Sequence, residues 1–384
     1  NNELVVVKTK EEEEKEEDLD ISEENEINNS NSPIVQLVNT IIRTAVREKA
    51  SDIHLVVGRP PMLRKHGSLE AFGDETLNPE AAKMLIYSIL NEEQRVKFEL
   101  EKELDFSFGV KDLGRFRANI HYQRGTIAAA LRSINTEIPT MSELGLPEVL
   151  KNFTEYNNGL VLVTGPTGSG KSTTLATLID EINRTKAEHI ITIEDPIEYL
   201  HRHQKCIVEQ REIGADTGSF ASALRYALRQ DPDVILIGEM RDLETIVAAL
   251  TAAETGHLVF GTLHTRDSAQ TIDRIVDVFP PNQQQQIRLQ LSNALKGIVS
   301  QQLIPSKNNS GMELAYEILI GTPAIGNLIR ESKTHQIYSM IQTGAKYGMR
   351  TMDSVLKELF DRGKISTIEY EKRMKTVQTL DKKF

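Results

Sequence analysis

The stretch Gly-Leu-Val-Leu-Val-Thr-Gly-Pro-Thr-Gly-Ser-Gly-Lys-Ser-Thr, residues 159–173, decides the fold of this chain. Residues 160–163 are wholly apolar, which predicts a short strand buried on both faces. Residues 165–172 match G-x-x-x-x-G-K-S/T, the pattern of a phosphate-binding loop, and residues 173–182 are predicted to form a helix. A glycine-rich turn that binds no nucleotide is the alternative, but this pattern rarely occurs by chance between a buried strand and a helix.

Each residue type in this loop suits a polyphosphate. Gly165, Gly168 and Gly170 allow backbone conformations that turn N–H groups inward onto phosphate oxygens. Lys171 supplies a compact positive charge for the β- and γ-phosphates, and the Ser172 hydroxyl is placed to bind Mg²⁺. The helix N-terminus adds free donors and a partial positive charge. ATP and Mg²⁺ are therefore the predicted cofactors, and the predicted binding residues are Gly165, Pro166, Thr167, Gly168, Ser169, Gly170, Lys171, Ser172 and Thr173.

Length and charge define the organisation of the rest of the chain. A chain of 384 residues predicts two or three domains. The net charge of −11 is concentrated in residues 1–30, which hold twelve acidic and three basic residues, so the remainder is close to neutral. Like charges at this density repel and leave little to bury, so residues 1–32 are predicted to be a disordered acidic tail. This tail is either a docking segment or a solvated extension.

Composition argues against several classes of function. The nearly neutral body, the aromatic content of 5% and the absence of tryptophan argue against a nucleic-acid partner. Cys206 is the only cysteine, which excludes an intrachain disulfide and a four-cysteine zinc site and fits a reducing cytosol. The sequence has no run of about 18 apolar residues and no secretory leader. We therefore expect a cytoplasmic protein that contacts a membrane only through a partner.

Residues 33–138 are predicted to form an α+β domain with a mostly antiparallel sheet. A helical period begins at Pro33, and residues 79–100 are also predicted to be helical. Asp52 and His54 lie on one side of a predicted strand, where such a pair is either a structural hydrogen bond or a catalytic dyad. A proline-bearing linker is expected at residues 139–150.

Arginines gather on the strands of this first domain. Arg115 and Arg117 alternate with Phe116, so both guanidinium groups share one face of their strand, and Arg132 lies on a later strand. The face is either exposed and solvated or directed at nucleotide phosphates, in the same or a neighbouring subunit. Arginine suits phosphate because its charge is fixed and its donors bind two oxygens at once.

Residues 151–384 are predicted to form an α/β domain. Buried strands at 190–193, 234–237 and 257–263 alternate with helices and end in polar residues, which indicates a parallel sheet with its ligand crevice at the carboxyl ends of the strands. From about residue 282 the chain is predicted to turn helical, because Ile287, Leu291, Leu295 and Ile298 recur at helical spacing. Residues 312–320 are predicted to add a late strand, and 323–332 and 351–375 two further helices.

Acidic residues and a histidine follow the predicted strands. Glu239 closes an apolar run, where a carboxylate holds Mg²⁺ or orients the attacking water. Glu194, Asp195 and Glu198 are either solvated loop acids or a second acidic contribution to the same site. His264 is either a structural histidine or a group that senses the γ-phosphate. No motif for acyl transfer, zinc proteolysis or dinucleotide binding follows a strand.

Longer stretches of the chain resemble the secretion and pilus motor ATPases, and within them the type IV pilus retraction motors. These stretches are residues 50–54, the loop at 165–172, Ile-Glu-Asp-Pro-Ile-Glu-Tyr at 193–199, and residues 227–242 and 256–265. The resemblance covers about residues 34–375. It implies a PAS-like N-terminal domain, a RecA-like ATPase core and a homohexamer. It further implies ATP hydrolysis that drives pilus retraction through the inner-membrane pilus platform protein, at the inner face of the cytoplasmic membrane.

The same resemblance implies roles for individual residues. Glu239 corresponds to the catalytic Walker B carboxylate, Glu198 to the second acid of the Asp box and His264 to the His-box residue. The resemblance makes Arg117 and Arg132 the best candidates for phosphate contacts between domains or subunits, and Arg115 the next candidate. The single cysteine favours the retraction branch, because assembly motors usually carry a four-cysteine zinc insertion. Gly326 departs from the retraction signature, which has an arginine at this place.

Three functions are compatible with these residues. The first is a hexameric motor that hydrolyses MgATP to power pilus retraction. The second is a nucleic-acid translocase built on the same core, which the nearly neutral body and the few aromatic residues disfavour. The third is an accessory or assembly-type pilus or secretion ATPase, or a ring that binds nucleotide to regulate another motor.

Overall fold

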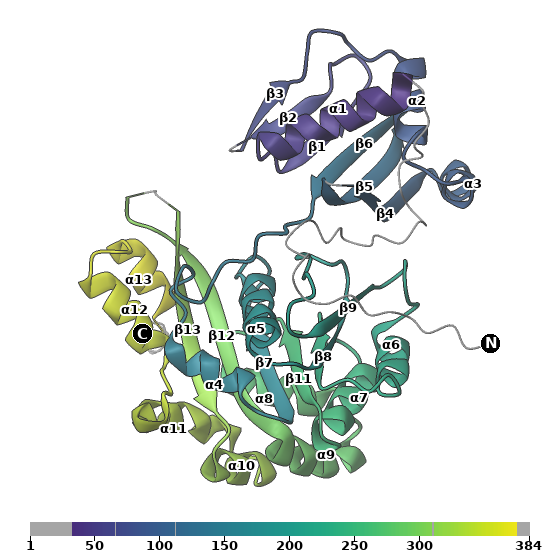
Figure 1. Ribbon diagram of the computed structural model, residues 1–384. Coiled ribbons are helices and arrows are strands. Elements are labelled where there is room, and N and C mark those ends of the chain that lie inside the picture. Colours follow the sequence, from purple (N-terminus) through teal and green to yellow (C-terminus); the bar gives the residue numbers. More distant parts are fainter. Residues whose placement is uncertain (1–32, 66, 112, 309–310, 375–384) are drawn as a thin grey trace, which may run out of the picture. The chain divides into compact units, whose positions relative to one another are not determined.

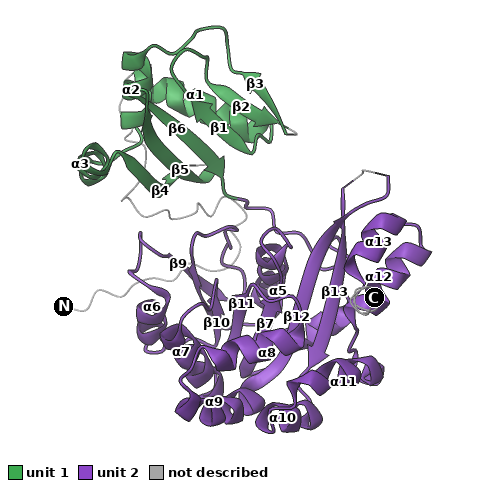
Figure 2. Ribbon diagram, turned by 180° about the vertical axis from the view of Figure 1, so that it is seen from behind, with its two compact units in different colours: residues 1–134 green, residues 135–384 purple. Residues whose placement is uncertain are grey.

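The computed structural model describes residues 33–65, 67–111, 113–308 and 311–374. The chain divides into two compact units, residues 1–134 and 135–384 (Figure 2). The expected boundary at residue 138 lies just beyond this division. The predicted acidic tail, residues 1–32, lies outside the described residues.

Unit 1 is built on a six-stranded sheet in which every neighbouring pair is antiparallel, as predicted. The order is β3-β2-β1-β6-β5-β4. The strands are β1 (Asp52–Leu55), β2 (Met62–Lys65), β3 (Ser68–Ala71), β4 (Glu103–Val110), β5 (Gly114–Gln123) and β6 (Thr126–Ser133). The helices are α1 (Pro33–Arg47), α2 (Pro79–Tyr87) and α3 (Glu92–Glu101).

One face of this sheet carries the core of unit 1. The apolar stripe of α1 and the buried side of α2 pack on alternate strand residues, among them Ile53, Leu131 and Ala118. The predicted helix over 79–100 is interrupted, because Asn91 caps a new helix: its side chain accepts from the Gln94 amide, and the Gln94 side chain accepts from the Asn91 amide.

Unit 2 is built on a seven-stranded sheet in the order β13-β12-β7-β11-β10-β8-β9 (Figure 1). All neighbouring pairs are parallel except β12 with β13. The strands are β7 (Gly159–Thr164), β8 (His189–Glu194), β9 (Ile207–Glu212), β10 (Val234–Ile237), β11 (Leu258–Leu263), β12 (Leu295–Pro305) and β13 (Met312–Ile320). Every residue of β7, β10 and β11 is buried, as their apolar sequences predict.

Helices cover both faces of this sheet. On one face lie α4 (Lys151–Thr154), α5 (Lys171–Thr185) and α12 (Met352–Asp361). On the other lie α6 (Phe220–Ala227), α7 (Leu243–Glu254), α8 (Ser268–Asp277), α9 (Pro281–Ala294), α10 (Pro323–Arg330) and α11 (Ile337–Thr343). The last described helix is α13 (Thr367–Arg373), and 3₁₀ turns lie at Glu148–Leu150, Thr334–Gln336 and Ala345–Tyr347. This two-sided cover is the arrangement of a RecA-like α/β core.

The prediction of an all-helical stretch from residue 282 to Ile298 is wrong. The helix α9 ends at Ala294, and Leu295 and Ile298 belong to strand β12. β12 is inserted between β7 and β13, so its apolar residues are buried on both faces and mimic a helical spacing. The predicted helix over 351–375 is likewise two helices, separated by a turn in which Gly363 adopts φ +66°.

Gly326 marks a close approach between α10 and α9. A Cβ placed at Gly326 would lie 3.2 Å from the Ser292 carbonyl oxygen and 3.4 Å from Nη1 of Arg330. That same Nη1 donates to the Ser292 hydroxyl over 3.0 Å. In this chain the guanidinium of Arg330 therefore lies where a side chain at position 326 would begin, and a larger residue there requires both neighbours to move.

Candidate nucleotide-binding and catalytic site

The loop between β7 and α5 has the backbone that its sequence predicts. Gly165, Gly168 and Gly170 have φ values of +147°, +76° and +85°. A Cβ at Gly165 would lie 2.3 Å from the Gln301 carbonyl oxygen, so glycine alone fits there. Gln301 in turn donates from Nε2 to the Ser169 carbonyl over 2.8 Å. The loop thus rests on strand β12.

The N-terminus of α5 is open to an anion. Its N-cap is Gly170, and no side chain caps it. The neighbouring helices differ, because Asp242 caps α7 and Asp267 caps α8 through their side-chain oxygens. The first amides of a helix have no intrahelical partner and carry the positive end of its dipole. The end of α5 can therefore hold phosphate, whereas those of α7 and α8 are already occupied by their own carboxylates.

Lys171 lies inside the loop. Its Nζ donates to the carbonyl oxygens of Gly165 over 2.9 Å and of Pro166 over 3.2 Å. Burial lowers the pKa of Lys171, and the charges of Glu239 and Glu198 act in the opposite direction. The ammonium is thus partly removed from water and lies near two carboxylates. Because these carboxylates repel phosphate, a polyphosphate is expected to bind here together with a cation that offsets the negative charge.

A cleft of about 510 Å³ opens over this loop. The carboxyl ends of β8, β10 and β11 form its far side, as the parallel-sheet rule predicts. Its lining comprises Thr167, Gly168, Ser169, Gly170, Lys171, Ser172, Thr173, Glu194, Asp195, Pro196, Glu198, Phe220, Gly238, Glu239, Arg241, Thr262, His264 and Leu303. The structure therefore brings Glu239, Glu198 and His264 to one cleft with the loop.

Glu239 has two basic neighbours, Arg241 and His264. Its Oε1 lies 3.1 Å from Nε2 of His264 and forms an ion pair with Arg241. Burial alone would raise the pKa of this carboxyl, but the Arg241 hydrogen bond and the positive charge of His264 outweigh it, so the pKa lies below its ordinary value. Glu239 is therefore an ionised carboxylate. No role was predicted for Arg241, although it lies two residues after Glu239.

Glu194 lines the same cleft, but its pKa is shifted in the opposite direction from that of Glu239. Burial raises the pKa of Glu194 to about 7, although Thr192 and Gln210 donate hydrogen bonds to its Oε1 over 2.7 and 3.2 Å. Two carboxyls of one cleft thus differ in charge at neutral pH, with Glu239 ionised and Glu194 partly protonated.

We expect Glu194→Gln to stabilise the protein at alkaline pH. A carboxyl with a raised folded-state pKa contributes stability below its unfolded pKa, and that contribution is lost as pH rises toward 7. The free energy of unfolding of the variant relative to wild type should therefore increase by about 1–3 kcal/mol between about pH 5 and pH 8. Urea unfolding at the two pH values measures it; a difference that is independent of pH contradicts the assignment.

Arg117 and Arg132 lie in unit 1. They are directly opposite each other on β5 and β6, so they share the sheet face that does not carry the core. Arg132 donates from Nε to Asp52 over 2.8 Å and is still 71% exposed. Asp52 also accepts from Ser51 over 2.8 Å. Both arginines can thus reach a ligand from this face, and their predicted contact with phosphate stays a prediction.

The residues on the cleft fit a magnesium ion bound together with a nucleotide. In the part of the chain that the structure describes, no three or more His, Cys, Asp or Glu side chains are arranged to hold a metal by themselves. Mg²⁺ usually takes only one or two protein ligands and fills its shell with phosphate oxygens and water. Ser172 and Glu239, which both line the cleft, supply a ligand set of that kind.

A buried strand, a phosphate loop, a helix with an open N-terminus and a carboxylate after a neighbouring strand define a P-loop ATPase with a RecA-like core. Residues 123–380 match the family model described as type II/IV secretion system protein. The chain belongs to this family.

Relatives of known name are similar over nearly their whole length. The type IV pilus retraction ATPase PilT of Pseudomonas aeruginosa is 53% identical over 86% of this chain and 95% of that protein. A twitching motility protein of Neisseria gonorrhoeae is 44% identical over 91% of this chain and 93% of its own. The crystal structure of the pilus retraction motor PilT with bound ADP superposes with a TM-score of 0.82 at 53% identity, covering 89% of this chain and 98% of that one.

No helix in the described ranges has the length and apolar character that crossing a membrane requires.

Proposed function

We propose that this protein is a motor ATPase that hydrolyses MgATP to power the retraction of type IV pili. One observation carries the proposal: an ionised carboxylate, Glu239, faces an uncapped helix N-terminus and Lys171 across a single cleft. The similarity to a pilus retraction ATPase, which covers 95% of the length of that protein, supports the pilus as the structure on which the motor acts.

The groups of the cleft divide the chemistry among them. The amides of residues 168–172 and the Lys171 ammonium bind the β- and γ-phosphates, which the absence of a side-chain cap on α5 and the position of Lys171 on the cleft support. Glu239 orients the attacking water and accepts its proton, and His264, 3.1 Å away, holds that carboxylate beside the γ-phosphate. Glu198 is the second acid that lines the cleft. Ser172 and Glu239 would hold Mg²⁺, which would supply positive charge to offset that of the phosphates.

The remaining parts of the proposal concern assembly. Six copies form a ring at the inner face of the cytoplasmic membrane, where they act on the pilus platform protein. Arg117 and Arg132 contact nucleotide phosphate from unit 1, in the same or a neighbouring copy. Their exposed position on a sheet face without a core supports this role, as does the fixed charge of arginine.

Complementation tests the function directly. In a cell that makes pili but lacks its own retraction motor, this protein alone should restore twitching and measurable retraction force. A variant with Lys171→Ala, present at the same level, should restore neither. Restoration that requires a second motor ATPase would assign the protein to the accessory class instead, and hydrolysis that DNA stimulates would favour the translocase.

A further inference from the structure

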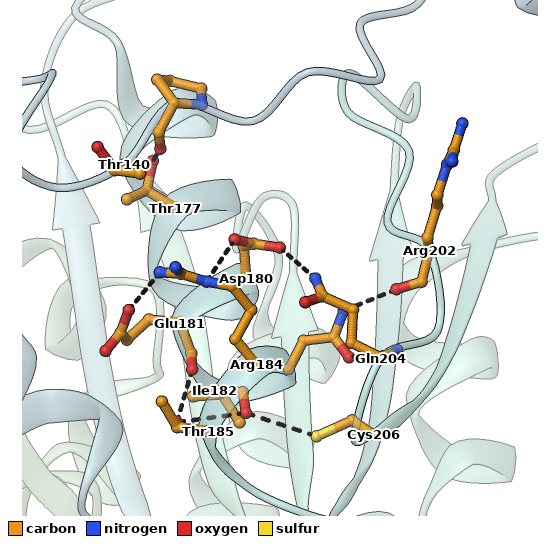
Figure 3. A network of polar contacts seen from close by, with 12 residues as sticks. Thr140, Thr177, Asp180, Glu181, Ile182, Arg184, Thr185, Arg202, Gln204 and Cys206 are labelled. Atoms are coloured by element: carbon orange, nitrogen blue, oxygen red, sulfur yellow. Dashed lines mark hydrogen bonds and ion pairs between the residues drawn. The ribbon is translucent and has the colours of Figure 1, made fainter. Parts of the chain in front are cut away.

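The first residues of unit 2 are hydrogen-bonded to the rest of that unit at two points. Asn135 forms a parallel bridge with Tyr199, in which the Leu200 amide donates to the Asn135 carbonyl over 2.9 Å. Four residues on, the Pro139 carbonyl accepts from the Thr177 hydroxyl over 2.8 Å (Figure 3). We call residues 135–140 the connecting segment.

Both points of attachment lead to the helix that begins in the phosphate loop. The Tyr199 and Thr173 hydroxyls lie 3.0 Å apart, and Thr173 lines the nucleotide cleft. Thr177 lies one turn further along α5, and its single hydroxyl proton is shared between the Pro139 carbonyl and the Thr173 carbonyl, which lies 2.9 Å away. Thr173 is therefore the residue at which the cleft, Tyr199 and Thr177 meet.

A third contact fixes Tyr199 from the strand side. Nε2 of Gln210 donates to the Tyr199 carbonyl over 2.8 Å and to Glu194 Oε1 over 3.2 Å. Oε1 of Gln210 accepts from the His201 amide over 2.8 Å. The backbone that pairs with Asn135 is thus bonded to a wall of the cleft as well as to α5.

The far end of α5 is bonded differently. There Asn183 donates to the Arg202 carbonyl over 2.7 Å, and Gln204 donates to Asp180 over 2.9 Å (Figure 3). These bonds hold the 202–206 loop. In the described residues, the hydrogen bonds from α5 to the connecting segment come from its second turn, close to the phosphate loop.

From this geometry we propose that Tyr199 is a positioning residue, which couples the nucleotide cleft to the connecting segment through its hydroxyl contact with Thr173. A nucleotide that fixes the first turn of α5 also fixes Thr173, and so favours the state in which residues 135–140 are bonded to Tyr199 and Thr177. A ligand shifts such an equilibrium only through differential contacts, and Thr173 supplies them here. The inference rests on the proposed function in that MgADP or MgATP is taken as the ligand.

Hydrogen exchange of the full chain tests this coupling. Amide exchange at Leu200, whose amide bonds to Asn135, and in residues 135–138 and 140 should slow by about three- to tenfold when saturating MgADP is added to wild type. In Tyr199→Phe, which loses only the phenolic oxygen, this ADP-dependent slowing should largely disappear. The matched control is Tyr338→Phe, which loses a 3.0 Å bond from its hydroxyl to Asp353 in the same unit and should keep the full response.

Kinetics provide the second readout. Loss of the Tyr199 hydroxyl in Tyr199→Phe should lower kcat by about fivefold while KM changes by less than about twofold, because the substrate still binds but is less well positioned. Thr177→Val should reduce the exchange response as well, since it removes the bond to Pro139. If Tyr199→Phe does not fold, the response of Thr177→Val decides the question alone.

The outcomes separate this inference from the function on which it rests. Binding of MgADP with unchanged exchange in residues 135–140 would overturn the coupling and leave the ATPase proposal intact. An exchange response that survives in both variants would show that these bonds are only structural, and would also overturn it. Failure of wild type to bind MgADP at all would instead remove the proposed function.

Discussion

Replacing Lys171 by alanine is expected to abolish ATP hydrolysis. The Lys171 ammonium is the only side-chain cation of the loop. It donates to the carbonyl oxygens of Gly165 and Pro166, and we propose that it donates to the β- and γ-phosphate oxygens when nucleotide is bound. Removing one such preorganised charge costs about 10²–10³-fold in kcat. A steady-state phosphate-release assay measures the loss, and titration with a fluorescent ADP should show weaker binding.

Lys186→Ala is the matched control for this experiment. Lys186 lies just beyond the other end of α5 and pairs with Glu188 over 3.5 Å, so the variant changes the net charge equally without touching the cleft. It should hydrolyse ATP at nearly the wild-type rate. Turnover near wild type in Lys171→Ala, with a comparable melting temperature, contradicts the assignment of the loop.

Replacing Glu239 by glutamine is expected to stop hydrolysis while leaving nucleotide binding nearly intact. The carboxylate is ionised in the cleft because Arg241 and His264 lower its pKa, and an amide of the same shape cannot accept the proton of the attacking water. Loss of a positioned base typically costs about 10²–10⁴-fold in kcat. Binding of ADP should change little, because the loop and Lys171 are untouched.

Glu244→Gln makes the same chemical change on an exposed residue in the first turn of α7 and serves as the control. It should leave kcat unchanged. If Glu239→Gln retains turnover, the base is another group, and Glu198, which also lines the cleft, becomes the next candidate. If Glu239→Gln instead loses ADP binding, the residue acts mainly on the metal or on the loop.

The core of the site was predictable because its signals are local. The apolar run of β7, the glycine spacing and the lysine occur in one continuous stretch, and each has a direct physical meaning. The rule that parallel strands present their carboxyl ends at one edge then placed Glu239, Glu198 and His264 together. The cleft lining contains all three.

The support beneath the loop was not predictable in the same way. Ser300 and Gln301 bond to Thr164 and Ser169, but they belong to β12, whose first residues, Leu295 to Ile298, were predicted to be helical. The cause is physical: a strand buried on both faces has no alternating pattern, and its apolar residues Leu295 and Ile298 continue the spacing of Ile287 and Leu291 in α9. Only pairing with β7 and β13 decides its conformation.

The bonds that hold the connecting segment were invisible for another reason. Thr177 and Pro139 lie 38 residues apart and Tyr199 and Thr173 lie 26 apart, and no periodicity relates such positions. Threonine in a helix normally bonds its own backbone, so its sequence gives no sign of a second partner. Arg241 was missed similarly, because an arginine two residues from a glutamate has no defined geometry until the chain folds.

A crystal structure of the full chain with Mg²⁺ and a nonhydrolysable ATP analogue tests the central claim most directly. We predict phosphate oxygens within hydrogen-bonding distance of the amides of residues 168–172, with Lys171 Nζ moved from the Gly165 carbonyl to a phosphate and Glu239 facing the γ-phosphate. A nucleotide bound elsewhere, with Lys171 still on the carbonyls of Gly165 and Pro166, would contradict the account.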